Sequence, residues 1–166
     1  ENGTEALGLE ELLARADAIS IAVPTIHHYK IAKQCIKRGV HVLVEKPFVD
    51  EQNQGEELIS LAEKNGVQIQ VGHIERFNPA IVALKNIIPD IDIISVKAER
   101  LGPPLDRTVN DSVVRDLIIH DIDILLWLID TDVSSISTLD SAEAYTTANF
   151  EFEDGTIGSL TASRVT

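Results

Sequence analysis

The chain has 166 residues, of which 44% are hydrophobic and 25% are charged, and these ordinary globular values exclude a fibre or a disordered tail. Its 14 lysines and arginines stand against 27 aspartates and glutamates, which gives a net charge of −13. Nucleic acids and anionic membranes both attract basic surfaces, so we expect neither of them to be a partner.

Cysteine and methionine are unusually scarce. The single cysteine, Cys35, allows no internal disulfide and no cysteine-built zinc site, which favours a cytoplasmic location. The apolar runs are too short to span a bilayer. Methionine is absent even at position 1, so we expect the sequence to be part of a longer protein.

The first half of the chain alternates strand and helix patterns. Hydrophobic spacing predicts helices over 9–16, 27–38 and 51–65, and strands over 18–23, 40–44 and 67–71. Strands joined by helical crossovers lie parallel in one sheet. We therefore predict an α/β fold with an open parallel sheet.

The second half has a different pattern. It predicts helices over 80–88 and 113–129, and strands over 91–101, 133–139, 142–152 and 156–163. Asp154-Gly155 between the last two strands is a hairpin signal. This order indicates an α+β domain with an open, mainly antiparallel sheet, and the strand pattern runs to the last residue, so we expect both sheets to be incomplete.

Polar residues follow the predicted parallel strands at 24–25, 45–47 and 72–73, the edge where open α/β sheets bind ligands. Thr25 and His28, taken alone, fit a helix cap and a surface histidine. Lys46 can place a positive charge beside a developing alkoxide, or it can be a solvated lysine at the end of a strand.

The helix over 113–129 carries the most informative pattern. At 100° per residue, Asp116, His120 and Asp123 share one stripe of an otherwise apolar helix. Buried carboxylates need partners or a polar cavity, so the stripe is either a proton-transfer site or a water-facing surface. Divalent metal binding is a third interpretation, weakened because no further ligand cluster stands out nearby.

Residues 72–79 are dense in polar side chains at the point where the fold changes, and domain junctions often form pockets. Arg76 can instead pair with Glu75 or Glu45, and Asn78 can cap the helix that follows. The nine glycines never form G-x-G, so neither a dinucleotide fingerprint nor a P-loop is present.

Taken together, these segments resemble the glucose–fructose oxidoreductase / inositol dehydrogenase (Gfo/Idh/MocA) family. The resemblance covers nearly the whole chain and rests on Val23-Pro24-Thr25-Ile26-His27-His28, Gly39 to Pro47 ending in Glu45-Lys46-Pro47, Val71 to Pro79, and the Asp-x-x-x-His-x-x-Asp helix from Asp116. It implies that residues 1–75 are part of a Rossmann-like dinucleotide-binding domain. Residues 76–166 would be part of a substrate-binding and dimerisation domain.

The resemblance also implies residue roles. Lys46 would be the catalytic lysine, and Asp116 and His120 would position and deprotonate a substrate hydroxyl while hydride passes to or from NAD or NADP. Four more residues match positions on the cofactor side: Pro24, Thr25, His28 and Glu45. Three others, in addition to Asp116, match the substrate side: His73, Arg76 and Asn78.

The family resemblance implies a sugar or nucleotide-sugar substrate and a homo-oligomer formed through the sheet. The sequences of residues 72–79 and 116–123 are similar to those of a branch of the family that oxidises the 3-hydroxyl of UDP-N-acetylglucosamine. Two alternatives from other classes remain: a binding or assembly module without cofactor, and a metal-dependent hydrolase using the acidic stripe. We expect the isolated chain to be inactive and to lack tight dinucleotide binding.

Overall fold

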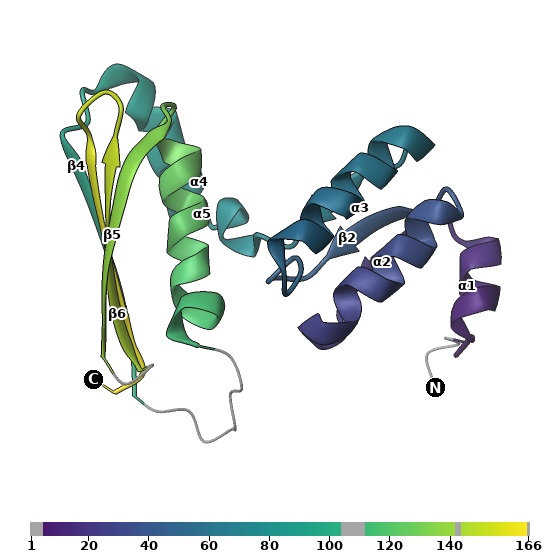
Figure 1. Ribbon diagram of the computed structural model, residues 1–166. Coiled ribbons are helices and arrows are strands. Elements are labelled where there is room, and N and C mark those ends of the chain that lie inside the picture. Colours follow the sequence, from purple (N-terminus) through teal and green to yellow (C-terminus); the bar gives the residue numbers. More distant parts are fainter. Residues whose placement is uncertain (1–4, 104–111, 142–143, 166) are drawn as a thin grey trace. The chain divides into compact units, whose positions relative to one another are not determined.

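The computed structural model describes residues 5–103, 112–141 and 144–165. The chain divides into two compact units, Glu1–Gly72 and His73–Thr166. The first runs from purple to blue-teal in Figure 1 and the second from teal to yellow.

The first unit alternates helices and strands as predicted. Its elements are α1 (Leu9–Arg15), β1 (Ala18–Ile21), a 3₁₀ turn (Thr25–His27), α2 (His28–Lys37), β2 (His41–Val44), α3 (Gln52–Asn65) and β3 (Ile69–Val71). The strands lie in the order β1-β2-β3 and are all parallel. The predicted parallel α/β sheet is therefore confirmed.

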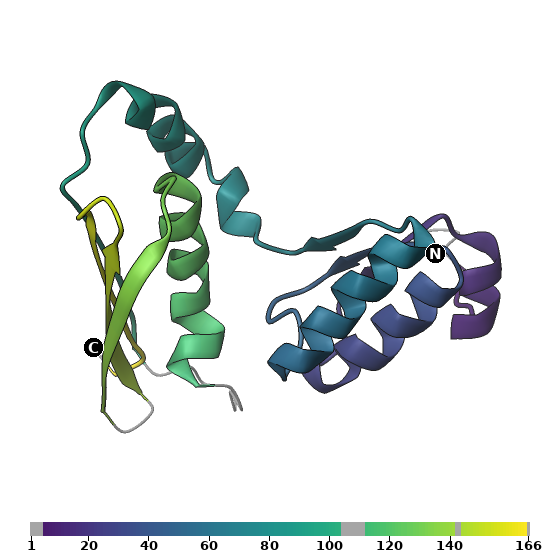
Figure 2. The ribbon, with the colours of Figure 1, turned by 45° about the horizontal axis from the view of Figure 1, so that its top comes forward.

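Helices α2 and α3 pack side by side on the sheet in both ribbon views (Figures 1 and 2). Apolar side chains from both helices and all three strands meet in this layer, among them the fully buried Cys35, Ile36, Val44 and Leu58. Gly66 ends α3 with a φ of 64°, a left-handed conformation that glycine adopts without strain. The core of this unit thus lies between the sheet and its two helices.

The second unit is an α+β arrangement. Its elements are a 3₁₀ turn (Ile74–Phe77), α4 (Pro79–Ile87), a 3₁₀ turn (Ile88–Asp90), β4 (Ser95–Leu101), a π-helical turn (Val114–Ile118), α5 (Ile119–Leu128), β5 (Val133–Ser141), β6 (Tyr145–Phe152) and β7 (Ile157–Ser163). The sheet order is β4-β7-β6-β5. Only β4 and β7 pair in parallel, which confirms an open, mainly antiparallel sheet.

Helix α5 lies along one face of this sheet (Figures 1 and 2). Its Leu125 is buried in a cluster with Phe150 and Phe152 of β6 and Leu160 of β7. Alternate residues of β6 and β7 point to this face, because side chains of a strand alternate between the two faces of a sheet. The position of α5 is thus fixed by apolar burial.

Two local sequence signals are confirmed in this unit. The Asn78 side chain accepts a hydrogen bond from the Ala80 N–H at 3.1 Å and caps α4. Asp154 accepts one from the Thr156 N–H at 2.9 Å, and Gly155 has a φ of 86°, so this pair forms the turn between β6 and β7.

The helix predicted as one continuous α-helix over 113–129 begins instead with the π-helical turn, which carries Asp116. A π-turn takes more residues per turn than an α-helix, so the angular spacing expected from 100° per residue does not hold there. No helix within the described ranges is long and apolar enough to cross a membrane.

Candidate active site

The carboxyl edge of the parallel sheet gathers the predicted polar residues of the first unit. Ile21, the last residue of β1, lies beside Val44, the last residue of β2. The Glu45 N–H donates to the Ile21 carbonyl at 3.0 Å, which holds the start of the loop carrying Lys46 next to the loop carrying Thr25. Lys46 is half-buried there.

His28 joins these two loops. It is 1% exposed, and its Nδ1 lies 2.9 Å from the Pro47 carbonyl oxygen while its Nε2 lies 2.8 Å from that of Val23. Both ring nitrogens are therefore engaged with backbone within the protein. We therefore assign His28 a structural role, which is to hold these two loops together. The sequence alone had suggested a surface histidine, and the family resemblance had suggested a direct contact with the cofactor.

Gly72, which follows β3, leaves room for the Glu45 side chain. A Cβ built on Gly72 would lie 3.0 Å from Glu45 Oε2 and 3.1 Å from its Cδ. Gly72 is also tied to the sheet, because its N–H donates to the Val44 carbonyl at 2.7 Å. A glycine at this position thus lets a carboxylate lie beside the loop of Lys46.

In the second unit, Asp116 lies in the π-helical turn and His120 follows it by four residues, at the start of α5. The Arg164 Nη2 donates to Asp116 Oδ2 at 2.8 Å, and the two side chains are 16% and 17% exposed. The Asp116 N–H donates to the Ser112 carbonyl at 3.1 Å. The Asp116 carboxylate is thereby anchored and remains partly accessible.

Asp121 and Asp123 of α5 are 8% and 9% exposed. Arg100 of β4 donates to both oxygens of Asp121, from Nε at 2.9 Å and from Nη2 at 2.8 Å. Its Nη1 lies 3.8 Å from Glu75 Oε1. The hydrogen bonds that Arg100 donates to Asp121 raise the pKa of Arg100, so this buried carboxylate has a permanent cationic partner.

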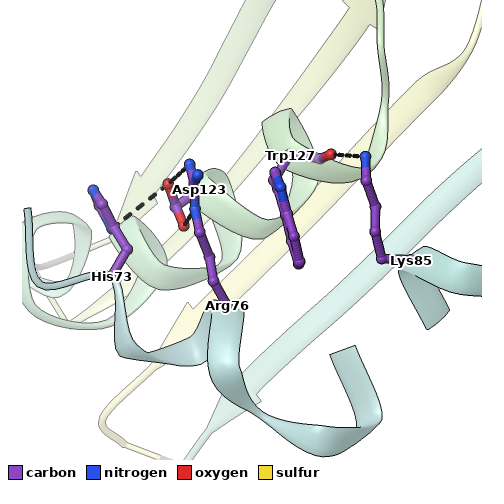
Figure 3. A network of polar contacts seen from close by, with 5 residues as sticks. All are labelled: His73, Arg76, Lys85, Asp123 and Trp127. Carbon is purple, nitrogen blue, oxygen red and sulfur yellow. Dashed lines mark hydrogen bonds and ion pairs between the residues drawn. The ribbon is translucent and has the colours of Figure 1, made fainter. Parts of the chain in front are cut away.

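Asp123 is the buried member of a second ion pair, drawn in Figure 3. Arg76 donates to it from Nε at 2.8 Å and from Nη2 at 2.6 Å, and His73 Nδ1 lies 3.6 Å from Asp123 Oδ1. These hydrogen bonds raise the pKa of Arg76. Arg76 therefore pairs with Asp123 and not with Glu75, one of the partners considered from the sequence.

Trp127 extends this network along α5. The Arg76 Cζ lies 5.7 Å and the Lys85 Nζ 5.4 Å from the centroid of its ring, distances at which cation–π attraction operates. Lys85 also donates a hydrogen bond to the Trp127 carbonyl, as Figure 3 shows. The network therefore ties both the 3₁₀ turn Ile74–Phe77 and α4 to α5.

The predicted stripe of Asp116, His120 and Asp123 is thus divided by its partners. Asp116 binds Arg164, at the end of β7, whereas Asp123 binds Arg76. Of the alternatives expected for buried carboxylates of this helix, partners or a polar cavity, Asp116 and Asp123 both have partners. Asn78 acts as a helix cap, so a substrate contact from it or from Arg76 stays a prediction.

Sequence reasoning missed Arg100, Asp121 and Arg164. A signal was present, because an aspartate buried on an apolar helix needs a partner, and the planar guanidinium of arginine matches a carboxylate. Within the described part of the chain, no three His, Cys, Asp or Glu side chains are grouped so as to hold a metal ion. The meeting of Lys46 with Asp116 and His120 stays a prediction.

Comparison with known proteins supplies the context. Residues 2–73 match the model of an oxidoreductase family with an NAD-binding Rossmann fold, GFO_IDH_MocA. UDP-N-acetylglucosamine 3-dehydrogenase of Acidithiobacillus ferrooxidans is 34% identical over 165 residues, covering 95% of this chain and 51% of the relative. Myo-inositol dehydrogenase Hyg17 of Streptomyces leeuwenhoekii is 28% identical, covering 98% of this chain and 56% of that protein.

The solved structure of UDP-N-acetylglucosamine 3-dehydrogenase GnnA from Acidithiobacillus ferrooxidans is similar with a TM-score of 0.89 and 33% identity. The matched region covers 96% of this chain and 54% of the GnnA chain. The chain thus spans about half the length of the relatives that it matches. The likeness runs through both units, and the chain belongs to the Gfo/Idh/MocA oxidoreductase family.

Proposed function

We propose that the full-length protein carrying this chain is an NAD(P)-dependent dehydrogenase that oxidises a hydroxyl group of a nucleotide sugar. The observation that carries this proposal is the anchored carboxylate of Asp116, four residues before His120 at the start of α5. A fixed carboxylate and an imidazole so close along one helix suit a site that positions a hydroxyl and removes its proton.

His120 is the proton acceptor in this scheme. It is partly exposed, and an imidazole takes up a proton readily near neutral pH. Asp116 orients the substrate hydroxyl through its partly accessible carboxylate, while Arg164 holds that carboxylate in place. Asp116 is thus a binding group and Arg164 a positioning residue.

Lys46 stabilises the negative charge that develops on the same oxygen. Its half-buried position after β2 reduces contact with water, and charge stabilisation is stronger where water is excluded. Its loop is held by the contacts of Glu45 and His28, so the ammonium group need not be reorganised during the reaction. We place Lys46 among the catalytic residues for this reason.

The donors and acceptors at the carboxyl edge of the parallel sheet fit the nicotinamide end of a dinucleotide. Pro24 and Thr25 follow β1 and Glu45 follows β2, so a hydroxyl, a carboxylate and the ammonium of Lys46 are available to ribose and carboxamide groups. When bound, the nicotinamide ring supplies the hydride acceptor or donor. No G-x-G occurs in the sequence, so this edge fits that end of the cofactor alone.

The substrate that we favour is UDP-N-acetylglucosamine, oxidised at its 3-hydroxyl. The relative bearing that activity in its name is 34% identical across 95% of this chain. The assay measures reduction of NAD and of NADP by the full-length protein with this nucleotide sugar. Myo-inositol, the substrate named for the 28% identical relative, serves as the competing substrate.

Three variants test the residue roles. His120→Ala and Lys46→Ala are each expected to lower kcat by about 10²–10⁴-fold with a smaller change in KM. His41→Asn is the matched control, because His41, the first residue of β2, is exposed and its Nδ1 accepts a hydrogen bond from the Gln68 N–H. Wild-type kcat in His120→Ala would reject the assignment of the base.

A further inference from the structure

His73 faces a carboxylate that is already held by an arginine. Its Nδ1 lies 3.6 Å from Asp123 Oδ1, and the same oxygen accepts a hydrogen bond from Arg76 Nη2 at 2.6 Å. Figure 3 shows the three side chains together, with the second ring nitrogen of His73 on the side away from Asp123. The three residues form an Arg–Asp–His series.

The hydrogen-bonding capacities of these groups decide where the His73 proton lies. The Nδ1 atom is buried and has no hydrogen-bond partner among the described residues, so the carboxylate is the polar group that it faces. An ionised carboxylate can only accept hydrogen bonds. A proton on Nδ1 therefore makes this contact favourable, whereas a lone pair on Nδ1 would face negative charge.

The distance of 3.6 Å is longer than a hydrogen bond, and side chains of binding sites commonly tighten when a ligand binds. Asp123 cannot follow freely, because both of its oxygens are held by Arg76. The distance between His73 Nδ1 and Asp123 Oδ1 would therefore shorten by movement of the His73 ring. His73 lies just before the 3₁₀ turn that carries Arg76.

We propose that Asp123, fixed by Arg76, holds His73 in the neutral Nδ1–H tautomer, so that its Nε2 accepts a hydrogen bond from a hydroxyl group of the sugar substrate. The His73 side chain is 24% exposed, which leaves the outer edge of the ring accessible. The identity of the ligand rests on the proposed function, whereas the tautomer follows from the three side chains alone.

Arg76 also decides which task suits His73. The guanidinium already compensates the charge of Asp123, so the pair that His73 faces carries no net charge. A neutral imidazole beside a neutral pair is a hydrogen-bond acceptor, which distinguishes His73 from the proton acceptor His120. Arg76 and Asp123 are therefore positioning residues for His73.

The tautomer can be read directly in the chain by nitrogen-15 NMR of its five histidine rings near neutral pH. His41 is an internal reference of the opposite kind, because its Nδ1 accepts from the Gln68 N–H at 2.9 Å and its proton must lie on Nε2. We expect His73 to show a protonated Nδ1 and a bare Nε2. An Nε2–H tautomer of His73 would overturn the proposal.

Two variants separate the inner contact from the outer one. In Asp123→Asn the carboxylate is removed, and His73 should lose its preference for the Nδ1–H form; an unchanged spectrum would contradict the role of Asp123. In His73→Asn the amide NH₂ can still face Asp123, whereas the outward acceptor is lost. If Asp123→Asn fails to fold, His73→Asn can still test whether the outward-facing nitrogen of His73 accepts a hydrogen bond from the substrate.

The role toward substrate is tested with the full-length protein and UDP-N-acetylglucosamine. His73→Asn should raise KM about tenfold, the value of one hydrogen bond, with a smaller effect on kcat. His41→Asn should leave both constants unchanged. Wild-type KM in a folded His73→Asn protein, with wild-type turnover present, would overturn the acceptor role and leave the proposed function intact.

The two proposals can fail separately. If the wild-type protein oxidises none of the sugars while His73 shows the Nδ1–H tautomer and Asp123→Asn abolishes it, the proposed function is wrong and the role of Asp123 is supported.

Discussion

Gly158 of β7 lies directly against Leu125 of α5. A Cβ built on Gly158 would lie 2.5 Å from Leu125 Cδ2 and 3.1 Å from its Cδ1. Leu125 is 1% exposed and belongs to the core of the second unit, so moving its side chain would disturb that packing. The close approach of helix and sheet therefore depends on the absence of a side chain at position 158.

Gly158→Ala should consequently destabilise the second unit by about 1–3 kcal/mol, as overpacking of a core does. Trp127 is the only tryptophan and belongs to this unit, so its fluorescence during urea unfolding is the measurement. Gly102→Ala is the control, because a Cβ built on Gly102 would meet no atom of the described residues within 4 Å. In a double-mutant cycle, Leu125→Ala should relieve much of the penalty; strict additivity would contradict the contact.

Asp123→Asn should lower the stability of the second unit by about 1–3 kcal/mol, because it leaves Arg76 without its charged acceptor. The Arg76 side chain is 42% exposed, so water limits the loss. The unfolding midpoint in urea, followed by circular dichroism as well as fluorescence, measures the effect.

The matched control is Lys97→Ala, which removes an exposed ion pair with Glu99 at 2.9 Å. Its effect should stay within about 0.5 kcal/mol. Equal midpoints for Asp123→Asn and the wild type would mean that the Arg76–Asp123 pair contributes nothing to stability.

Cys35 should resist thiol reagents until the first unit unfolds. The side chain is 0% exposed, and burial raises the pKa of its thiol. Labelling with a thiol reagent over a urea series should therefore follow the unfolding of this unit. Rapid labelling of the native protein would show that the helix–sheet layer opens locally.

The raised pKa of Cys35 also gives a pH dependence. The thiol ionises at a lower pH in the unfolded chain than in the folded protein. Its contribution to stability is therefore intact below about pH 8.5, near the pKa of the unfolded chain, and is lost as the pH rises through the pKa of the folded protein. Cys35→Ala should lose less stability than the wild type between neutral and alkaline pH. Parallel losses in the two proteins would contradict this.

Arg164→Ala should lower kcat of the full-length enzyme about tenfold, because the Asp116 carboxylate loses the hydrogen bond at 2.8 Å that fixes it. Arg164→Lys keeps the positive charge and loses the planar guanidinium, so its kcat should lie between those of Arg164→Ala and the wild type. Lys97→Ala is again the control, and unchanged kcat in a folded Arg164→Ala protein would remove Arg164 from the positioning residues.

The order of helices and strands followed from the sequence in both units. Hydrophobic spacing, the Asn78 cap, the Gly66 helix end and the Asp154-Gly155 turn are local features, and each depends on residues only a few positions apart. The same spacing placed Lys46 after β2 and Asp116 close to His120. What it misjudged was the π-helical turn, because a change of helical hydrogen bonding leaves the apolar pattern nearly unaltered.

The partners of the buried carboxylates were decided by the tertiary structure. Asp121 and Arg100 are 21 residues apart, Asp123 and Arg76 are 47 apart, and Asp116 and Arg164 are 48 apart. The sequence indicated that carboxylates buried on this apolar helix need partners or a polar cavity, since unpaired buried charges are too costly. Which arginine pairs with which aspartate depends on how the sheet and the 3₁₀ turn pack against α5. A local sequence pattern does not specify contacts between residues so far apart in the chain.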